Sequence, residues 1–189
     1  VFAHIENLYE VLHSLKALIA PTTTIVIENH YLGSVLDGNQ FDTFYHEHPR
    51  TYSYTSFVHM AKLLNIQLID VEFPARYGGN IRVFMGNSVS NTVGIDLKEL
   101  DKRESLYFEQ FSALRNNIER WKGSKKKKIE LLVKNFGKLR AKAFPGRAAI
   151  LVKLLELSED QIVAVYEKPG SLKINHFLPG TRIPIHSDD

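Results

Sequence analysis

Two apolar runs separated by only five residues are the feature that most constrains the fold of this chain. Residues 66–74, IQLIDVEFP, and residues 80–86, NIRVFMG, are rich in apolar and β-branched side chains, which is typical of strands. The connection ARYGG contains Gly78 and Gly79, whose backbone freedom permits a tight turn. Because another β-branched run lies at residues 22–29, TTTIVIEN, the sequence predicts a sheet that is complete by residue 86.

Helical patterns accompany these strands. Residues 5–19 place apolar side chains three and four apart, and Pro21 closes the pattern. Residues 56–65 form a second predicted helix. The predicted strand at residues 22–29 ends with Glu28 and Asn29. In open α/β sheets, ligands bind at the carboxyl ends of the strands. Polar side chains at this strand end are therefore candidates for a binding site.

The composition changes near residue 95, where a long helical pattern begins. Aromatic and aliphatic residues recur three or four apart from Phe108 to Trp121, and we expect a dent at Gly123 before the helix resumes and ends at Gly137. Further elements are expected in this order: a strand at 138–144, a turn at 145–147, a helix at 148–157, a strand at 161–168, and a turn at Pro179 and Gly180 followed by an extended segment. The sequence thus predicts an α/β protein with domains at residues 1–90 and 91–189.

Composition excludes several classes of protein. With 44% hydrophobic and 24% charged residues, the chain of 189 residues has the composition of an ordinary globular protein. It contains no cysteine, which rules out disulfides and thiolate metal sites within it. A net charge of +3 is too small to indicate nucleic-acid binding, and the lysines at 125–128 are interpreted as a solvated helix face. No run of about 18 apolar residues is present, so we expect a cytoplasmic protein without membrane contact.

The segment FDTFYHEHPRTYS, residues 41–53, concentrates groups that can do chemistry. Tyr45, His46, Glu47 and His48 are consecutive, and their spacing leaves three interpretations open. The two histidines could bind zinc if a third ligand came from His30, His4 or Glu28. The four side chains could have a purely structural role. They could also transfer protons, because an imidazole titrates near neutral pH and a phenol can hydrogen-bond an enolate oxygen.

Three further positions have both a structural and a functional interpretation. Gly78 and Gly79 form a turn, or let a ligand approach the backbone. Arg82 is a solvent-facing strand residue, or clamps a phosphate. Arg147 precedes a predicted helix within FPGRA, where it and the backbone amides could hold an anion.

Five segments taken in order, VFAHIENL, IVIENHYL, FDTFYHEHPRTYS, RYGGNIRVF and LPGTRIPI, resemble the sugar C-methyltransferases. These enzymes transfer a methyl group from S-adenosylmethionine to nucleotide-linked keto-deoxysugars. The resemblance implies that the chain begins late in a Rossmann-like class I methyltransferase domain, whose sheet ends by about residue 90, and continues into a smaller C-terminal α/β domain. It also implies that zinc-binding and donor-binding regions lie upstream. We therefore expect a fragment, starting at Val1, that transfers no methyl group alone.

The resemblance also implies roles for individual residues. His48 would be the general base that removes a proton from the carbon beside the ketone, giving an enolate. Tyr45 would hydrogen-bond the sugar, Glu47 would orient or tune the imidazole, and His4 would hold the substrate, with no metal at the reacting centre. Further substrate-binding residues would be Gly78, Gly79, Arg82, Arg147 and Lys173.

A non-catalytic nucleotide-sugar-binding or assembly module of the same fold is the alternative, and a metal hydrolase built on the His and Glu cluster is a third hypothesis. Because surfaces normally covered by upstream regions would be exposed in a fragment, we also expect that the chain could form a homo-oligomer.

Overall fold

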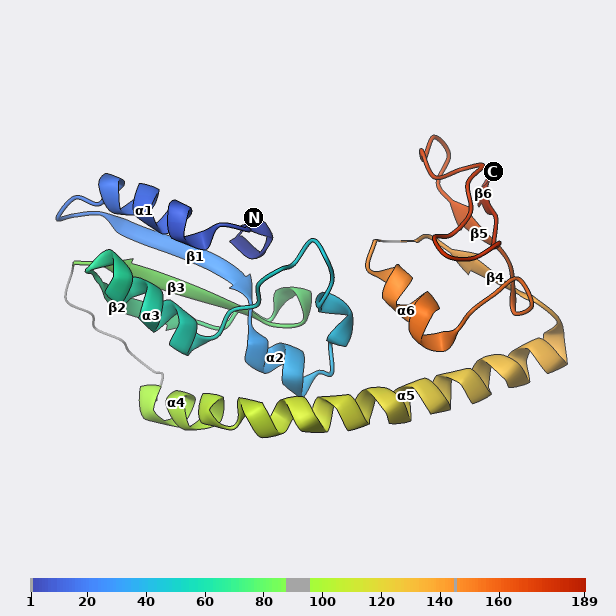
Figure 1. The fold of residues 1–189 in the computed structure, drawn as a ribbon, viewed down its shortest axis with the longest axis horizontal. Coiled ribbons are helices and arrows are strands. Elements are labelled where there is room, and N and C mark those ends of the chain that lie inside the picture. The colour runs from blue at the N-terminus through green and yellow to red at the C-terminus, as the bar shows by residue number, and fades with distance from the viewer. Residues whose placement is uncertain (1, 88–95, 145) are drawn as a thin grey trace. The chain divides into compact units, whose positions relative to one another are not determined.

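The computed structural model describes residues 2–87, 96–144 and 146–189 (Figure 1). Its contacts divide the chain into two compact units, residues 1–115 and residues 116–189, and each is described by itself. Helices and strands occur in both units, which confirms the predicted α/β class. Position 145, part of the predicted turn at 145–147, lies outside the described residues.

The first unit is built on a three-stranded sheet. Its strands are β1 (Thr24–His30), β2 (Gln67–Glu72) and β3 (Asn80–Gly86), in the order β1-β3-β2. Both neighbouring pairs are antiparallel, so the two runs joined by ARYGG are adjacent strands as expected. The register aligns Glu28 with Arg82 and His30 with Asn80. Polar side chains from two strands therefore meet at one end of the sheet.

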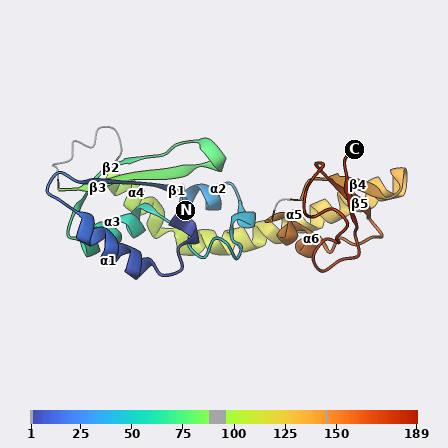
Figure 2. The same ribbon diagram turned by 90° about the horizontal axis from the view of Figure 1, so that it is seen from above.

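One face of this sheet carries the hydrophobic core. Residues alternate in direction along each strand, and Ile27, Val71 and Val83 lie on the buried face. Figure 2 shows α1 (Leu8–Leu18) and α3 (Tyr54–Leu64) on one side of the sheet. Their apolar stripes supply the remaining core side chains, among them Leu12, Phe57, Met60 and Leu64. The helix α3 begins at a capping box in which Ser53 and Ser56 each bond the other's backbone amide, which fixes its start.

Short elements that the sequence patterns did not reveal connect the strands and helices. The helix α2 (Leu32–Asp37) follows β1 directly, and 3-10 turns occur at Phe2–His4, Phe41–Thr43 and Arg76–Gly78. A Cβ atom at Gly33 would lie 2.7 Å from the Tyr107 hydroxyl oxygen, so only glycine lets this tyrosine approach α2. Helices of six residues are too short to show a helical period, which explains why α2 was missed.

Glu104, at the end of α4 (Leu97–Ser105), is a buried carboxylate that holds α3 in place. It accepts hydrogen bonds from the backbone amides of Tyr54 and Thr55, each at 2.8 Å, and from the Thr55 hydroxyl at 2.6 Å. The Tyr31 hydroxyl also donates to it, at 3.0 Å. The carboxylate thus satisfies free amides at the start of a helix, where a negative charge is favourable.

The helix α5 (Tyr107–Phe136) contains 30 residues and runs without a break through Gly123. The predicted dent at this glycine is wrong. A glycine inside a helix costs only about 1 kcal/mol relative to alanine, which the many good helix formers around it can offset. The break comes earlier in the chain, at Leu106 between α4 and α5.

The second unit contains a smaller parallel sheet. Its strands β4 (Leu139–Lys142), β5 (Ile162–Glu167) and β6 (Ile185–Ser187) lie in chain order, and α6 (Ala148–Leu155) connects the first two. Its core contains Phe144, Val165, Leu178, Ile183 and Ile185. The helix ends two residues before the predicted position, because Glu156 adopts a left-handed conformation with φ of 54°. None of the helices in the described part of the chain is long and apolar enough to cross a bilayer.

Candidate functional site

His48 and Tyr45 lie together in the loop that follows the 3-10 turn at Phe41–Thr43. The backbone amide of His48 donates to the Tyr45 carbonyl at 2.8 Å, which forms a tight turn. The Tyr45 hydroxyl lies 3.4 Å from the Nε2 atom of His48, and the two ring centroids are 4.6 Å apart. Both side chains are half-buried. The turn therefore holds a phenol against an imidazole.

His4, from the N-terminal segment, lies beside His48 and Tyr45. It ends the first 3-10 turn, and its ring meets that of His48 edge to face at a centroid distance of 4.8 Å. His4 is exposed, whereas His48 is half-buried. Arg50 fixes the segment beside His4, because its guanidinium donates to the backbone carbonyls of Ile5 and Glu6 at 3.2 and 2.9 Å. The structure thus brings three of the four predicted catalytic residues together.

The Glu47 carboxylate lies near His46, although its predicted role is to orient or tune His48. Its carboxylate lies 3.9 Å from the Nε2 atom of His46, and both side chains are largely exposed. An exposed pair at this distance contributes little to stability. In this structure Glu47 acts on His48 electrostatically and raises the pKa of the imidazole, the last of several causes, and its predicted orienting role stays a prediction.

Burial is the main cause that lowers the pKa of His48 below its ordinary value. The neighbouring imidazoles His4 and His30 act in the same direction, since a second positive charge nearby disfavours protonation. A backbone group of Thr43 opposes this shift. His48 is consequently neutral near pH 7, the protonation state in which an imidazole can accept a proton.

Three buried polar atoms at the end of β1 and the start of β3 lack a hydrogen-bond partner among the described residues: Asn29 Nδ2, His30 Nδ1 and Asn80 Oδ1. The other nitrogen of His30, Nε2, lies 2.6 Å from the carbonyl oxygen of Tyr77 and therefore carries the proton. Buried polar groups are normally paired, so this end of the sheet is suited to a polar ligand or an ordered water.

Glu28 is the centre of a charged cluster beside these atoms. Its carboxylate accepts hydrogen bonds from Arg76 at 2.6 Å, Asn80 at 2.7 Å and Arg82 at 2.8 Å. Arg82 also contacts Glu72 at 2.7 Å. A guanidinium whose N–H groups already donate to two carboxylates has few donors free for a phosphate. Phosphate binding by Arg82 therefore stays a prediction, and the contacts favour a role in joining the three strands.

Acidification should show what the Glu28 cluster contributes to stability. Hydrogen bonds from Arg76 and then Asn80 lower the pKa of Glu28 to about 2, against an ordinary value of 4.5. Because the folded pKa is the lower one, the stabilisation is complete above pH 4.5 and is lost as the pH falls through about 2. We expect the difference in unfolding free energy between wild type and Glu28→Gln to shrink over this range in urea titrations. The control Glu109→Gln should show no such change, and a pH-independent difference would contradict the assignment.

Gly78 and Gly79 are required by the backbone itself. Their φ angles are 86° and 116°, values that residues with a side chain rarely adopt. A Cβ atom on Gly78 would lie 2.6 Å from the Nε2 atom of Gln40, and one on Gly79 would collide with Ser34. Protein side chains therefore occupy the space beside both glycines. Their predicted contact with substrate remains untested.

The two remaining predicted residues belong to the second unit. Arg147 precedes α6 and is exposed. The ammonium group of Lys173 donates to the carbonyl of Phe144 and lies 3.2 Å from the buried carboxylate of Glu167. Hydrogen bonds from the Phe144 amide and then Lys173 lower the pKa of Glu167. Lys173 thus already has partners within the chain, and its predicted contact with substrate stays a prediction.

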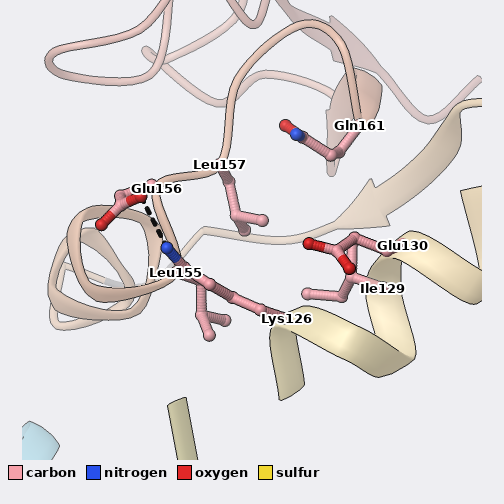
Figure 3. Close-up of a pocket in the computed structure, with 7 residues that line it drawn as sticks. All are labelled: Lys126, Ile129, Glu130, Leu155, Glu156, Leu157 and Gln161. Atoms are coloured by element: carbon pink, nitrogen blue, oxygen red, sulfur yellow. Dashed lines mark ion pairs between the residues drawn. The ribbon is translucent and has the colours of Figure 1, made fainter. Parts of the chain in front are cut away.

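Figure 3 shows a pocket of the second unit that contains none of the predicted residues. The Nζ atom of Lys126 pairs with the Glu156 carboxylate at 2.6 Å across it. The lining is completed by aliphatic and polar side chains: Ile129, Glu130, Leu155, Leu157 and Gln161. No group of three or more His, Asp or Glu side chains in the described ranges is arranged to hold a metal ion. The chemistry-bearing residues of the first unit therefore remain the strongest candidates.

Comparison with known proteins assigns the chain to a family. A family model described as the C-methyltransferase C-terminal domain matches residues 75–189. Because this match covers more than half of the chain, the chain belongs to that family. The C-methyltransferase NovU of Streptomyces niveus is 28% identical over 193 residues, which cover 100% of this chain and 46% of NovU. The resemblance drawn from the five sequence segments is thereby confirmed, and the chain spans less than half the length of this relative.

Proposed function

We propose that this chain supplies the substrate-binding and proton-abstracting part of an S-adenosylmethionine-dependent C-methyltransferase. The substrate would be a nucleotide-linked keto-deoxysugar, methylated at a carbon next to the ketone. The observation that carries this proposal is the position of His48, half-buried and neutral near pH 7 between His4 and Tyr45. A neutral imidazole beside a phenol suits removal of a proton next to a carbonyl group.

In this proposal the Nε2 atom of His48 takes the proton from the carbon, and the electron pair of the C–H bond moves toward the ketone oxygen. The Tyr45 hydroxyl, 3.4 Å from this nitrogen, is near enough to donate a hydrogen bond to the enolate oxygen as charge develops. This separation is long for a hydrogen bond, and such contacts often tighten when substrate binds. His4 would position the sugar against the His48 ring.

S-adenosylmethionine would supply the methyl group that the enolate carbon receives. Gln40 and Ser34 take the space beside the paired glycines at 78 and 79, so this turn lends no support to donor binding. The family resemblance places the donor pocket upstream of residue 1. Our assignment for this chain is therefore limited to holding the acceptor and removing its proton.

Methyl transfer can be tested with the protein expressed from its natural start codon. The protein would be incubated with S-adenosylmethionine and a panel of nucleotide-linked 4-keto-6-deoxysugars, and the sugar products analysed by mass spectrometry. We expect at least one sugar to gain the mass of a methylene group, since one hydrogen is replaced by a methyl group. A panel without donor controls for other changes in mass.

A protein that binds both the donor and a nucleotide-linked sugar but gives no methylated product would contradict the proposed reaction. That outcome would instead support the non-catalytic binding module of the same fold.

A further inference from the structure

Tyr77 combines an exposed aromatic ring with an unfavourable backbone conformation. Its side chain is 79% exposed, and its φ and ψ angles of 55° and 26° lie in the left-handed region. A bulky residue is a genuine outlier there, whereas glycine or asparagine would adopt this conformation readily. Strained residues of this kind persist where the surrounding structure imposes them, and they cluster at ligand sites.

Three hydrogen bonds hold the conformation of the loop at residues 76–79, two from outside the loop and one within it. The Nε2 atom of His30 lies 2.6 Å from the Tyr77 carbonyl oxygen, and Gln40 donates to the Gly78 carbonyl at 2.8 Å. The Gly79 amide donates to the Arg76 carbonyl at 3.0 Å. The loop is thus held at every residue from 76 to 79, although the Tyr77 ring itself is mostly exposed. The backbone from which the Tyr77 ring projects is therefore held in place.

Arg76 covers one side of this ring. Its guanidinium carbon lies 5.7 Å from the Tyr77 ring centroid, within the range of a cation–π contact. Two of its nitrogens are held 2.6 Å from the Glu28 carboxylate, so the guanidinium cannot swing away freely. With 79% of the Tyr77 side chain exposed, the opposite ring face is open. An oriented ring with one open face is the arrangement on which a planar ligand group can stack.

We infer that Tyr77, supported by Arg76, is the stacking platform for the nucleobase of the substrate. This inference rests on the proposed function, which supplies a nucleotide-linked sugar. His30 connects the two parts of the site, because its ring contacts the Tyr77 carbonyl and it lies close enough to His48 to lower the pKa of that imidazole. One end of the sheet would then hold the base and direct the attached sugar toward the imidazole. The strained backbone is the stability cost of presenting the ring.

Binding measurements on the protein expressed from its natural start codon test this inference. The ligands are thymidine, uridine, cytidine and guanosine diphosphates, with inorganic pyrophosphate as the probe that lacks a base, all measured by calorimetry. For the nucleoside diphosphate that binds wild type best, Tyr77→Asn should weaken binding by about tenfold. Tyr77→Phe should stay within about twofold, because it keeps the aromatic face. Pyrophosphate binding should be unchanged in both variants.

Thermal stability separates a binding role from a structural one. Tyr77→Asn relieves the left-handed strain, so we expect its melting temperature to rise by about 2–4 °C while its affinity falls. The matched control is Tyr9→Asn, which alters another exposed tyrosine, 74% exposed, on the regular helix α1. That control should leave affinity unchanged and give no gain in melting temperature.

Unchanged nucleoside diphosphate affinity in Tyr77→Asn, or loss of affinity together with a lower melting temperature, would overturn the inference. Failure of every nucleoside diphosphate to bind wild type would overturn it as well. Methyl transfer with an unchanged KM in Tyr77→Asn would reject the platform and leave the proposed function standing. Base-dependent binding without methyl transfer would reject the reaction and leave the platform standing.

Discussion

Replacing His48 by asparagine is expected to lower kcat for methyl transfer by about 10²–10⁴-fold, the usual contribution of a general base. Asparagine keeps a polar side chain of related shape but cannot accept a proton from carbon. His48 is half-buried against Tyr45 and His4, which holds its imidazole in place. The measurement is the rate of methylated sugar formation at saturating substrate, followed by mass spectrometry.

His46→Asn is the matched control, because this neighbouring histidine is exposed and contacts Glu47 instead. It should change kcat by less than about twofold, and donor affinity should be unchanged in both variants. A second readout is the pH dependence of kcat/KM for wild type, which reports the pKa values of the free enzyme. The pKa of His48 is lowered, so kcat/KM should rise with pH along a limb centred below the ordinary histidine value of about 6.5. Full activity in His48→Asn would remove His48 as the base.

Glu104→Gln is expected to lower the free energy of unfolding of the first unit by about 2–4 kcal/mol. The wild-type carboxylate accepts from two backbone amides and three hydroxyl groups. Glutamine has one acceptor oxygen in its side chain. Its NH₂ group would face the buried N–H and O–H donors that the carboxylate accepts from in wild type. The loss can be measured by urea unfolding monitored by circular dichroism. Amide hydrogen exchange at the start of α3 should also be faster in the variant than in wild type.

Glu99→Gln provides the comparison for this substitution, since Glu99 is an exposed residue of the same helix. It should change stability by less than about 0.5 kcal/mol. If Glu104→Gln were no more destabilising than Glu99→Gln, the hydrogen bonds made by Glu104 would not be a significant source of stability. A matching loss in both variants would point to the helix α4 itself.

Most of the regular elements could be predicted from the sequence, because their signals are local. The strands β1 and β3 are dense runs of β-branched and apolar residues, and the helix α3 has both an apolar stripe and serine caps. The pairing of β2 with β3 followed from the short connection between them. The dent expected at Gly123 failed because a single glycine weakens a long helix without breaking it.

The site was harder to predict, because it depends on contacts between distant residues. His4 and His48 are 44 positions apart, and only the family resemblance associated them before the structure showed their rings in contact. Arg82 and Lys173 have residue types suited to phosphate, and their carboxylate partners became apparent only in three dimensions. Tyr77 gave no sequence signal as a binding residue. Its backbone strain is visible only in the fold.

The order of the first sheet has a consequence for how this chain behaves by itself. Within the described residues β1 pairs with β3 on one side only, so its outer edge presents unpaired amides and carbonyls. Val26 in this strand is 51% exposed. An unpaired edge is a template on which another strand can add. Strand addition to residues 1–189 in isolation can therefore occur at this edge or at the outer edge of β2, and a lysine in place of Val26 would oppose it at β1.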